Sequence, residues 1–289
     1  MTVYQTVSAF LGRHGFNAHC PNVNAVIEGL LFDMEQGLEV GPGTGNMDSS
    51  QEMIPTWSNP PSQSPKNTSV IVIDAGGTNF RSCLVSFDGN GTPTISDLEK
   101  CSMPGIGKEL SKKDFFDTIA KNLDHLKNKA TRIGFCFSYA MKITPEGDGE
   151  VLSFSKEIKA KEVIGSLVGK CLSDALVERG WNRPEKIVLM NDTTAALLAG
   201  ASNATEGRAY SSYVGFILGT GMNTAYIESN PIGKIDNSKA PKSQIVVCES
   251  GMYNKISRSE FDIDFDKTTN TPNRYVMEKM CSGAYLGPV

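Results

Sequence analysis

The sequence lacks the features of a membrane-spanning, secreted or disulfide-stabilised protein. No apolar run approaches the roughly 20 residues that a transmembrane helix needs, and the N-terminus (MTVYQTVSAFLGRHGF) has no charged region followed by a long apolar one, as a signal peptide would. The seven cysteines are scattered and odd in number, without a C-x-x-C pair, which disfavours a disulfide framework and a zinc site. We therefore expect a chain of the reducing cytoplasm.

Concentrated charge is also missing. Charged residues make up 21% of the chain, the net charge is −4, and lysine and arginine form no basic stripe. This disfavours nucleic acid and anionic membranes as main partners. The three histidines, His14, His19 and His125, stand outside any cluster with metal-ligand spacing, so zinc chemistry and hydrolytic triads are disfavoured as well.

What is present is a packed, alternating pattern of strands and helices. Hydrophobic residues make up 39% of 289 residues, enough for one large domain or two ordinary ones. We expect helices at 22–38, 112–128, 159–180 and 193–202, strands at 69–74, 80–87, 93–103, 132–138, 186–190, 213–218 and 224–228, and a Gly/Pro/Ser-rich connector at 40–67. Three meandering strands followed by alternating helices and strands indicate an α/β fold.

A glycine turn follows the strand at 69–74, in the sequence DAGGTNFR at residues 74–81. Glycine lets backbone N–H groups approach phosphate oxygens, while Asp74 would orient Mg²⁺ through water and Arg81 would reach a phosphate. The alternative is an ordinary hairpin turn that requires positive φ. A dinucleotide-binding loop is excluded, because G-x-G-x-x-G is absent and the chain returns as a strand.

The same device, a strand, a glycine turn and a returning strand, recurs at residues 213–228. Its turn, GTGMN at 219–223, is common by itself. Paired with the first turn, it predicts a second phosphate loop and a weak internal repeat of two related lobes.

Further polar residues follow apolar segments. Asn191-Asp192 lies between a strand and a helix, where Asp192 is either a helix N-cap or a general base at the carboxyl end of a strand. The remaining candidates each have an ordinary alternative, such as a solvated lysine, a turn serine or an exposed helix face: Ser138, Ser155, Lys156, Glu249 and Glu278.

In order along the chain, these segments resemble the hexokinase family of the actin-like sugar kinases. The family's D-L-G-G-T-N-F-R reads D-A-G-G-T-N-F-R here. The other matching segments are MIPTW, GFCFS with SFSKEIKA, VLMNDTTAALLAG, ILGTGMNTAYIE, VVCESG and EKMCSGAYLG, within residues 24–287. The resemblance implies an RNase H-like (actin-like ATPase) fold with two lobes around a cleft for sugar and ATP.

The resemblance also implies a role for each candidate. Asp192 would take the proton of the sugar 6-hydroxyl, and Lys156 would hold the sugar and help stabilise the moving phosphoryl group. The other hydroxyls would be bound by Ser138, Ser155, Asn191, Asn223, Glu249 and Glu278. ATP phosphates would be held by Asp74, Gly76, Gly77, Thr78, Asn79, Arg81, Gly219, Thr220 and Gly221, with Mg²⁺ at Asp74. The implied reaction is phosphorylation of glucose, mannose or fructose by ATP, the first step of glycolysis.

The sequence departs from the family pattern at several places. Tyr139 stands where the family often has Pro, Glu157 where it often has Gly, and Ser250 where it usually has Trp. The family also continues past the EKMCSG segment, so we expect a partial chain with an incomplete second lobe. Its expected parts are an N-terminal helical segment with its connector (1–67), a small lobe (68–208) and the start of a large lobe (209–289).

Two other functions remain open from the sequence. A non-catalytic sugar sensor would use the same fold and bind hexose without transferring phosphate. Another actin-like ATPase, such as a heat-shock-type chaperone, would use the first loop but would leave the sugar segments unexplained. Repressor-type sugar kinases usually carry a Cys/His zinc motif, which is absent here.

Overall fold

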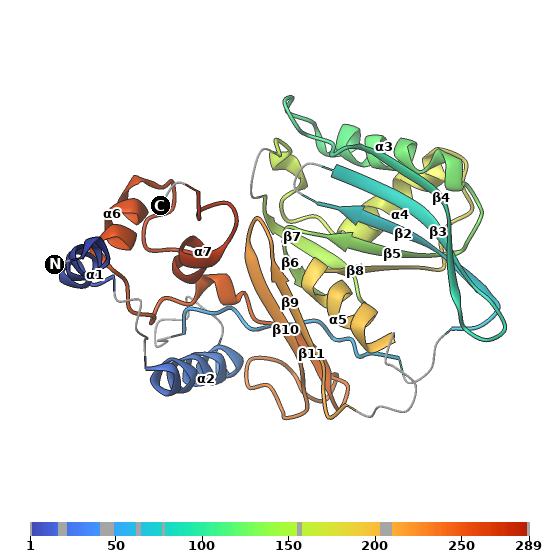
Figure 1. The fold of residues 1–289 in the computed structure, drawn as a ribbon. Helices are drawn as coiled ribbons and strands as arrows, with labels where there is room; N and C mark the ends of the chain where they lie inside the picture. The colour runs from blue at the N-terminus through green and yellow to red at the C-terminus, as the bar shows by residue number, and fades with distance from the viewer. Residues whose placement is uncertain are drawn as a thin grey trace. The chain divides into compact units, whose positions relative to one another are not determined.

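A computed structural model of the protein describes residues 2–16, 22–40, 49–61, 65–76, 79–154, 158–202 and 210–287. The chain forms two compact units (Figure 1). The central unit comprises Pro55–Tyr213 and Lys239–Ile245, and the terminal unit comprises Met1–Ile54, Val214–Ser238 and Val246–Val289. The domain boundaries expected near residues 67 and 208 stay a prediction.

The central unit is built on a five-stranded sheet in the order β4-β3-β2-β5-β8. Its strands are β2 (Thr68–Ala75), β3 (Asn79–Phe87), β4 (Pro93–Ser102), β5 (Arg132–Phe137) and β8 (Lys186–Met190). The first three form an antiparallel meander, whereas β5 and β8 join parallel to β2. The five predicted strands are confirmed, and β2, β5 and β8 end at the same edge of the sheet (Figure 1).

Helices of the central unit supply much of its core. They are α3 (Lys112–Asn122), α4 (Val168–Glu178) and α5 (Asp192–Ser202), with short 3-10 turns at Asp124–Leu126 and Lys161–Val163. Buried aromatic and aliphatic side chains of the sheet and of α3 and α4 form one cluster, including Ile71, Ile73, Phe115, Ile119, Phe135, Phe137, Leu172 and Leu176. One continuous apolar core thus packs against the sheet and keeps its strands in place.

The predicted helix at 159–180 is wrong over its first part, because α4 begins only at Val168. Gly165 adopts a positive φ of 78°, which ends the preceding 3-10 turn. The carboxylate of Asp148 then accepts hydrogen bonds from the backbone N–H groups of Gly169 (2.7 Å) and Lys170 (2.9 Å) and so caps α4. Asp148 lies in the turn of a hairpin of β6 (Ala140–Ile143) and β7 (Gly149–Ser153), which was not predicted.

The terminal unit combines helices with the hairpin of the second glycine turn. Strands β9 (Val214–Leu218) and β10 (Met222–Glu228) pair antiparallel. They belong to a sheet with the order β1-β11-β10-β9. The other two strands, β1 (Ile54–Pro55) and β11 (Gln244–Val247), lie where the chain passes from one unit to the other. The helices are α1 (Val3–Arg13), α2 (Val23–Glu39), α6 (Glu260–Thr268) and α7 (Val276–Cys281), with a 3-10 turn at Ser250–Met252. The predicted strands and the helix at 22–38 are confirmed.

Helices α1 and α6 were not predicted, although each begins with a capping box. Thr2 with Gln5, and Ser259 with Asp262, exchange side-chain and backbone hydrogen bonds at the first turns. The three-residue spacing within each pair is the sequence pattern from which these helix starts could have been predicted. Among the described residues, no helix has the length and apolar character needed to cross a membrane.

Candidate functional site

In the central unit, candidate residues gather where β2, β5 and β8 end. In the sheet register Asp74 pairs with Cys136, and Cys136 pairs with Met190. Ser138 follows β5, and its backbone N–H donates to the carbonyl of Ala75 at 3.1 Å. Because parallel neighbours lie about 4.8 Å apart, the ends of β2 and β8 are separated by the width of one strand.

Cys136 lies on the strand between those that end near Asp74 and Asp192. Burial, together with the negative charges of Asp74 and Asp192, raises the pKa of Cys136 to about 12, against the lowering effect of a hydrogen bond with Ser138. Asp74 and Asp192 therefore act on one buried group between them. Two carboxylates thus lie at one sheet edge, where their negative charges suit a cation or a proton donor.

The turn between β8 and α5 assigns different tasks to Asn191 and Asp192. Asn191 Oδ1 accepts a hydrogen bond from the backbone N–H of Thr193 at 2.8 Å, so Asn191 makes the N-cap contact. Asp192 is the first residue of α5, and its carboxylate accepts from the Thr193 hydroxyl at 3.3 Å. The ordinary interpretation of Asp192 as the cap is therefore wrong, and its half-buried carboxylate lies at a helix N-terminus, where a negative charge is favoured.

The first glycine turn is held at several atoms. Arg81 Nη1 pairs with Asp74 Oδ2 at 2.6 Å, and both side chains remain about two-fifths exposed. The N–H of Gly76 donates to the carbonyl of Asn79 at 3.0 Å, while the Tyr139 hydroxyl donates to the Gly76 carbonyl at 2.8 Å. Arg81, expected on a phosphate, thus pairs with Asp74 in this structure.

Several predicted residues lie outside the described part of the chain. Gly77 and Thr78 of the first turn belong to this group, as do Ser155 and Lys156 of the sugar segment. Their predicted roles stay predictions.

In the terminal unit, the second glycine turn has a geometry that suits an anion. The carbonyl oxygens of Gly219 and Thr220 accept hydrogen bonds from the N–H groups of Gly283 (2.7 Å) and Ala284 (3.1 Å), which turns them toward the end of α7. Within the described residues, the N–H groups of Thr220 and Gly221 donate no hydrogen bond. Nothing lies within 4 Å of the position that a Cβ on Gly219 would take, so a phosphate oxygen has room to approach this backbone.

Asn223 and Glu249 lie beside this turn and contact each other. Asn223 Nδ2 donates to Glu249 Oε1 at 2.7 Å, and the backbone N–H of Glu249 donates to Asn223 Oδ1 at 3.0 Å. The Thr224 hydroxyl donates a hydrogen bond of 2.9 Å to the hydroxyl of the next residue, Ser250. Ser250 therefore fastens the Glu249 turn to β10 with a hydroxyl where the family usually has an indole.

Glu278 reaches the same place from α7. Its Oε2 accepts a hydrogen bond from the backbone N–H of Met222 at 2.9 Å. An added Cβ on Gly221 would lie 2.7 Å from Glu278 Oε2, and one on Gly251 would lie 3.1 Å from Glu278 Cβ. The structure therefore brings Asn223, Glu249 and Glu278 together at the start of β10, as a polar cluster that we call the β10 cluster.

Sequence reasoning missed three contributors to these sites: Cys136, Tyr139 and Gly251. Tyr139 stood out in the sequence because it departs from the family pattern, but the spacing of residues along the chain does not predict its contact with Gly76. Among the described residues, no group of three or more His, Cys, Asp or Glu side chains is arranged to hold a metal ion. A metal at Asp74 would therefore depend largely on water and phosphate oxygens.

Comparison with protein families identifies the chain. Residues 13–202 match the first hexokinase family profile, and residues 213–289 match the second. The chain belongs to the hexokinase family. The resemblance drawn from the ordered motifs is confirmed.

Curated hexokinase relatives are similar along nearly the whole chain. Hexokinase-1 of Schizosaccharomyces pombe is 29% identical over 283 residues, which cover 92% of this chain and 56% of the relative. The hexokinase-like 1 protein of Arabidopsis thaliana is 30% identical over 289 residues, covering 93% of this chain and 55% of the relative. The chain thus spans about half the length of the curated relatives it matches.

Solved hexokinase structures have the same fold. The hexokinase from Schistosoma mansoni complexed with glucose superposes with a TM-score of 0.70 at 24% identity, covering 98% of this chain and 64% of that one. A second hexokinase crystal structure gives a TM-score of 0.69 at 25% identity, covering 91% of this chain and 59% of that one. The predicted RNase H-like (actin-like ATPase) α/β fold is confirmed.

Proposed function

We propose that this chain carries the sugar-binding and phosphate-loop portion of an ATP-dependent hexokinase, which transfers the γ-phosphoryl group of ATP to the 6-hydroxyl of glucose or a similar hexose. The observation that carries the proposal is the position of Asp192, which follows β8 and is separated from Asp74 on β2 by the single strand β5. A proton acceptor and a phosphate loop then serve one reaction. Membership of the hexokinase family supports this assignment.

In this proposal, Asp192 removes the proton from the sugar O6 as O6 bonds to the γ-phosphorus. The bond from that phosphorus to the bridging oxygen breaks, and ADP leaves with the bond's electron pair. Asn191 uses its Oδ1 to cap α5, so its amide nitrogen is the part that donates to a sugar hydroxyl. Positioning of this kind contributes more to phosphoryl transfer than covalent chemistry does.

The β10 cluster provides the other sugar contacts. A hexose is neutral and carries hydroxyl groups, so its site needs carboxylates and amides that each accept or donate in a fixed direction. Glu249 and Glu278 accept from hydroxyls, and Asn223 orients Glu249. Ser138, Ser155 and Lys156 complete the proposed set, the last also stabilising the transferred group.

The residues of the glycine turns fit ATP with Mg²⁺. The N–H groups of Thr220 and Gly221, with the open space at Gly219, suit phosphate oxygens. Arg81 would exchange its contact with Asp74 for a phosphate, and Asp74 would then hold Mg²⁺ through water. When bound, Mg²⁺ neutralises phosphate charge. With this activity the protein would carry out the first step of glycolysis, in the reducing cytoplasm.

An Asp192→Asn variant tests the proposal. We expect turnover in a coupled ATP-to-hexose assay to fall by about 10²- to 10⁴-fold, while glucose still raises the melting temperature, since a ligand at 100 times its Kd adds about 2.7 kcal/mol. Asp174→Asn, an exposed change on α4, is the matched control. Retained turnover in Asp192→Asn would sink the role of Asp192, and a glucose shift without turnover in the unaltered chain would favour the sugar sensor.

A further inference from the structure

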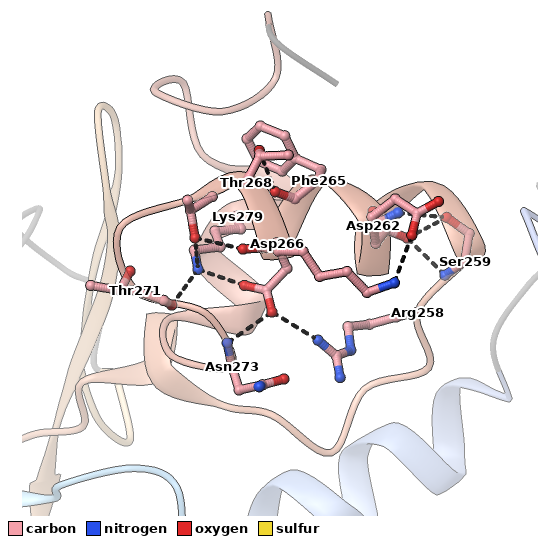
Figure 2. A network of polar contacts seen from close by, with 12 residues as sticks. Arg258, Ser259, Asp262, Phe265, Asp266, Thr268, Thr271, Asn273 and Lys279 are labelled. Carbon is pink, nitrogen blue, oxygen red and sulfur yellow. Dashed lines mark hydrogen bonds and ion pairs between the residues drawn. The ribbon is translucent and has the colours of Figure 1, made fainter.

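A buried ion pair holds α7, the helix that carries Glu278, against α6 (Figure 2). Lys279 Nζ lies 2.6 Å from Asp266 Oδ1, and the two side chains are only 4% and 7% exposed. Buried charges of this kind are costly unless they are fully paired.

All three donors of the Lys279 ammonium are used. Besides Asp266, they reach Thr269 Oγ1 at 2.8 Å and the Thr271 carbonyl at 2.6 Å. An ammonium group has three N–H donors, so this geometry fixes its position from three directions. Lys279 is thereby fastened to the α6–α7 loop at the side chain's far end.

The partner carboxylate is fixed as well. Asp266 Oδ2 accepts a hydrogen bond from the Asn273 backbone N–H at 2.8 Å and lies 3.5 Å from Arg258 Nη1 (Figure 2). Asp266 also closes the end of α6, since its carbonyl accepts from the Thr269 hydroxyl at 2.8 Å. Asp266 is therefore fixed within α6 and the loop after it, and the ion pair holds α7 against them.

Helix α7 needs such an anchor. It spans only Val276–Cys281, and its N-cap residue, Tyr275, has a left-handed backbone and makes no side-chain cap contact. Helices this short do not persist without tertiary contacts. Consecutive residues on a helix point about 100° apart, so Lys279 is directed into the loop while its neighbour Glu278 reaches the N–H of Met222.

We propose that Lys279, through its ion pair with Asp266, is a positioning residue that sets the direction of the Glu278 carboxylate in the β10 cluster. The space around Glu278 is narrow, because two glycines lie against it: an added Cβ would be 2.7 Å from Glu278 Oε2 at Gly221 and 3.1 Å from it at Gly251. A small rotation of α7 therefore moves the carboxylate out of line with the Met222 N–H. This inference rests on the proposed function, in which Glu278 binds a hexose hydroxyl.

Calorimetric titration of the full chain with glucose and with a set of monodeoxyglucoses tests the inference. The variants are Lys279→Met, Asp266→Asn and, as the reference pattern, Glu278→Gln. We expect Lys279→Met and Asp266→Asn to weaken glucose binding by about 10- to 100-fold, as displaced site groups do. The loss should vanish for the same monodeoxyglucose for which Glu278→Gln costs nothing, because that sugar lacks the hydroxyl which Glu278 binds.

Controls separate positioning from general stability. Lys267→Met removes another lysine that pairs with an aspartate, Asp264, but both side chains are exposed, and we expect glucose binding to be unchanged. Lys279→Arg keeps the charge and should recover part of the affinity. Circular dichroism and a thermal melt establish that each variant is folded at the titration temperature.

Three results would overturn the proposal. One is glucose affinity within about twofold of the unaltered chain in folded Lys279→Met. Another is an equal loss for every monodeoxyglucose, which a general loosening of the fold would give. The third is unfolding of both Lys279→Met and Asp266→Asn, since the pair would then hold the whole unit and not Glu278 in particular. Absence of glucose binding by the folded, unaltered chain is a different result, which would refute the proposed function itself.

Discussion

Asn223 and Glu249 are joined by two hydrogen bonds that use both ends of the Asn223 amide. The amide nitrogen donates to Glu249 Oε1 at 2.7 Å, and the amide oxygen accepts from the Glu249 backbone N–H at 3.0 Å. Glu249 has a left-handed backbone with φ of 57°, which is unfavourable for a residue with a Cβ. The Asn223 contacts compensate for this strain, and so they fix both the backbone and the carboxylate of Glu249.

Replacement of this amide should therefore weaken hexose binding. In Asn223→Ala, Glu249 loses a hydrogen bond to its charged group, which is typically worth about 1.5–3 kcal/mol. We expect the glucose Kd to rise by roughly 10- to 100-fold in calorimetry. Asn90→Ala, in an exposed turn of the central unit, should leave the Kd unchanged. An unaltered Kd in folded Asn223→Ala would contradict a role of this pair in the sugar site.

The contact of Tyr139 with Gly76 leads to a prediction about the nucleotide. In Tyr139→Phe the buried ring keeps its packing against Phe137 and Phe154, but the Gly76 carbonyl loses its donor. The lost hydrogen bond is worth about 1 kcal/mol. We expect the KM for ATP to rise by about fivefold while the KM for glucose stays constant, because the first glycine turn is loosened and the β10 cluster is not touched.

Tyr210→Phe is the matched control for this change, since Tyr210 is half exposed. It should leave both KM values unchanged. Equal rises in the KM for ATP and for glucose after Tyr139→Phe would indicate a general loss of stability instead of a local effect on the turn.

The positions of most site residues could be predicted because they depend on local patterns. The run SVIVID predicts a buried strand that ends at Asp74, and Asp192 was a candidate base because it follows the carboxyl end of the strand at 186–190, where open α/β sheets bind ligands. The glycine turns are likewise local, because each joins two adjacent strands with fixed pairing. Patterns within a few residues were sufficient for these features.

Features that depend on contacts between distant residues could not be predicted. The start of α4 is set by Asp148, whose carboxylate caps the helix from 21 residues away. Lys279 finds Asp266 only after α6 and α7 have packed, and nothing in the sequence distinguishes it from an exposed lysine. The cap of α5 is Asn191 and not Asp192. Both residue types favour the N-cap position, so the sequence alone does not tell which of the two residues precedes the first helical turn.

The ion pair of Asp266 predicts a dependence of stability on pH. Burial alone would raise the pKa of Asp266, but the hydrogen bonds from Lys279 and Asn273 and the charges of Lys279 and Arg258 lower it below 3.8. Because the folded-state pKa is depressed, the stabilisation is fully present above about pH 3.8 and is lost as the pH falls through the folded-state value.

Urea unfolding of the unaltered chain and of Asp266→Asn at several pH values between 7 and 3 checks this expectation. At neutral pH, Asp266→Asn should lower the free energy of unfolding by at most about 3–5 kcal/mol, the cost of removing one partner of a buried pair. Below pH 4 the difference between the two proteins should shrink. If the difference in the free energy of unfolding stays constant down to pH 3, the protonation of Asp266 is not coupled to folding in this range, which contradicts the prediction.

The two glycines of the second turn should respond differently to alanine. Neither has a positive φ, so the backbone accepts a Cβ at both positions. At Gly219 the Cβ would meet nothing within 4 Å, whereas at Gly221 it would lie 2.7 Å from Glu278 Oε2. Gly221→Ala therefore displaces the Glu278 carboxylate from the Met222 N–H, while Gly219→Ala fills only the space that we assign to phosphate.

We expect Gly221→Ala to raise the glucose Kd by about tenfold or more, in keeping with the loss of one charge-assisted hydrogen bond. Gly219→Ala should keep the glucose Kd and weaken ATP binding, measured by titration with a fluorescent nucleotide. Gly200→Ala, also in open space but on α5, serves as the control and should change neither constant. Because the two test positions are separated only by Thr220, the opposite responses would distinguish the sugar side of the turn from its phosphate side. Equal effects of both changes on glucose would refute that division.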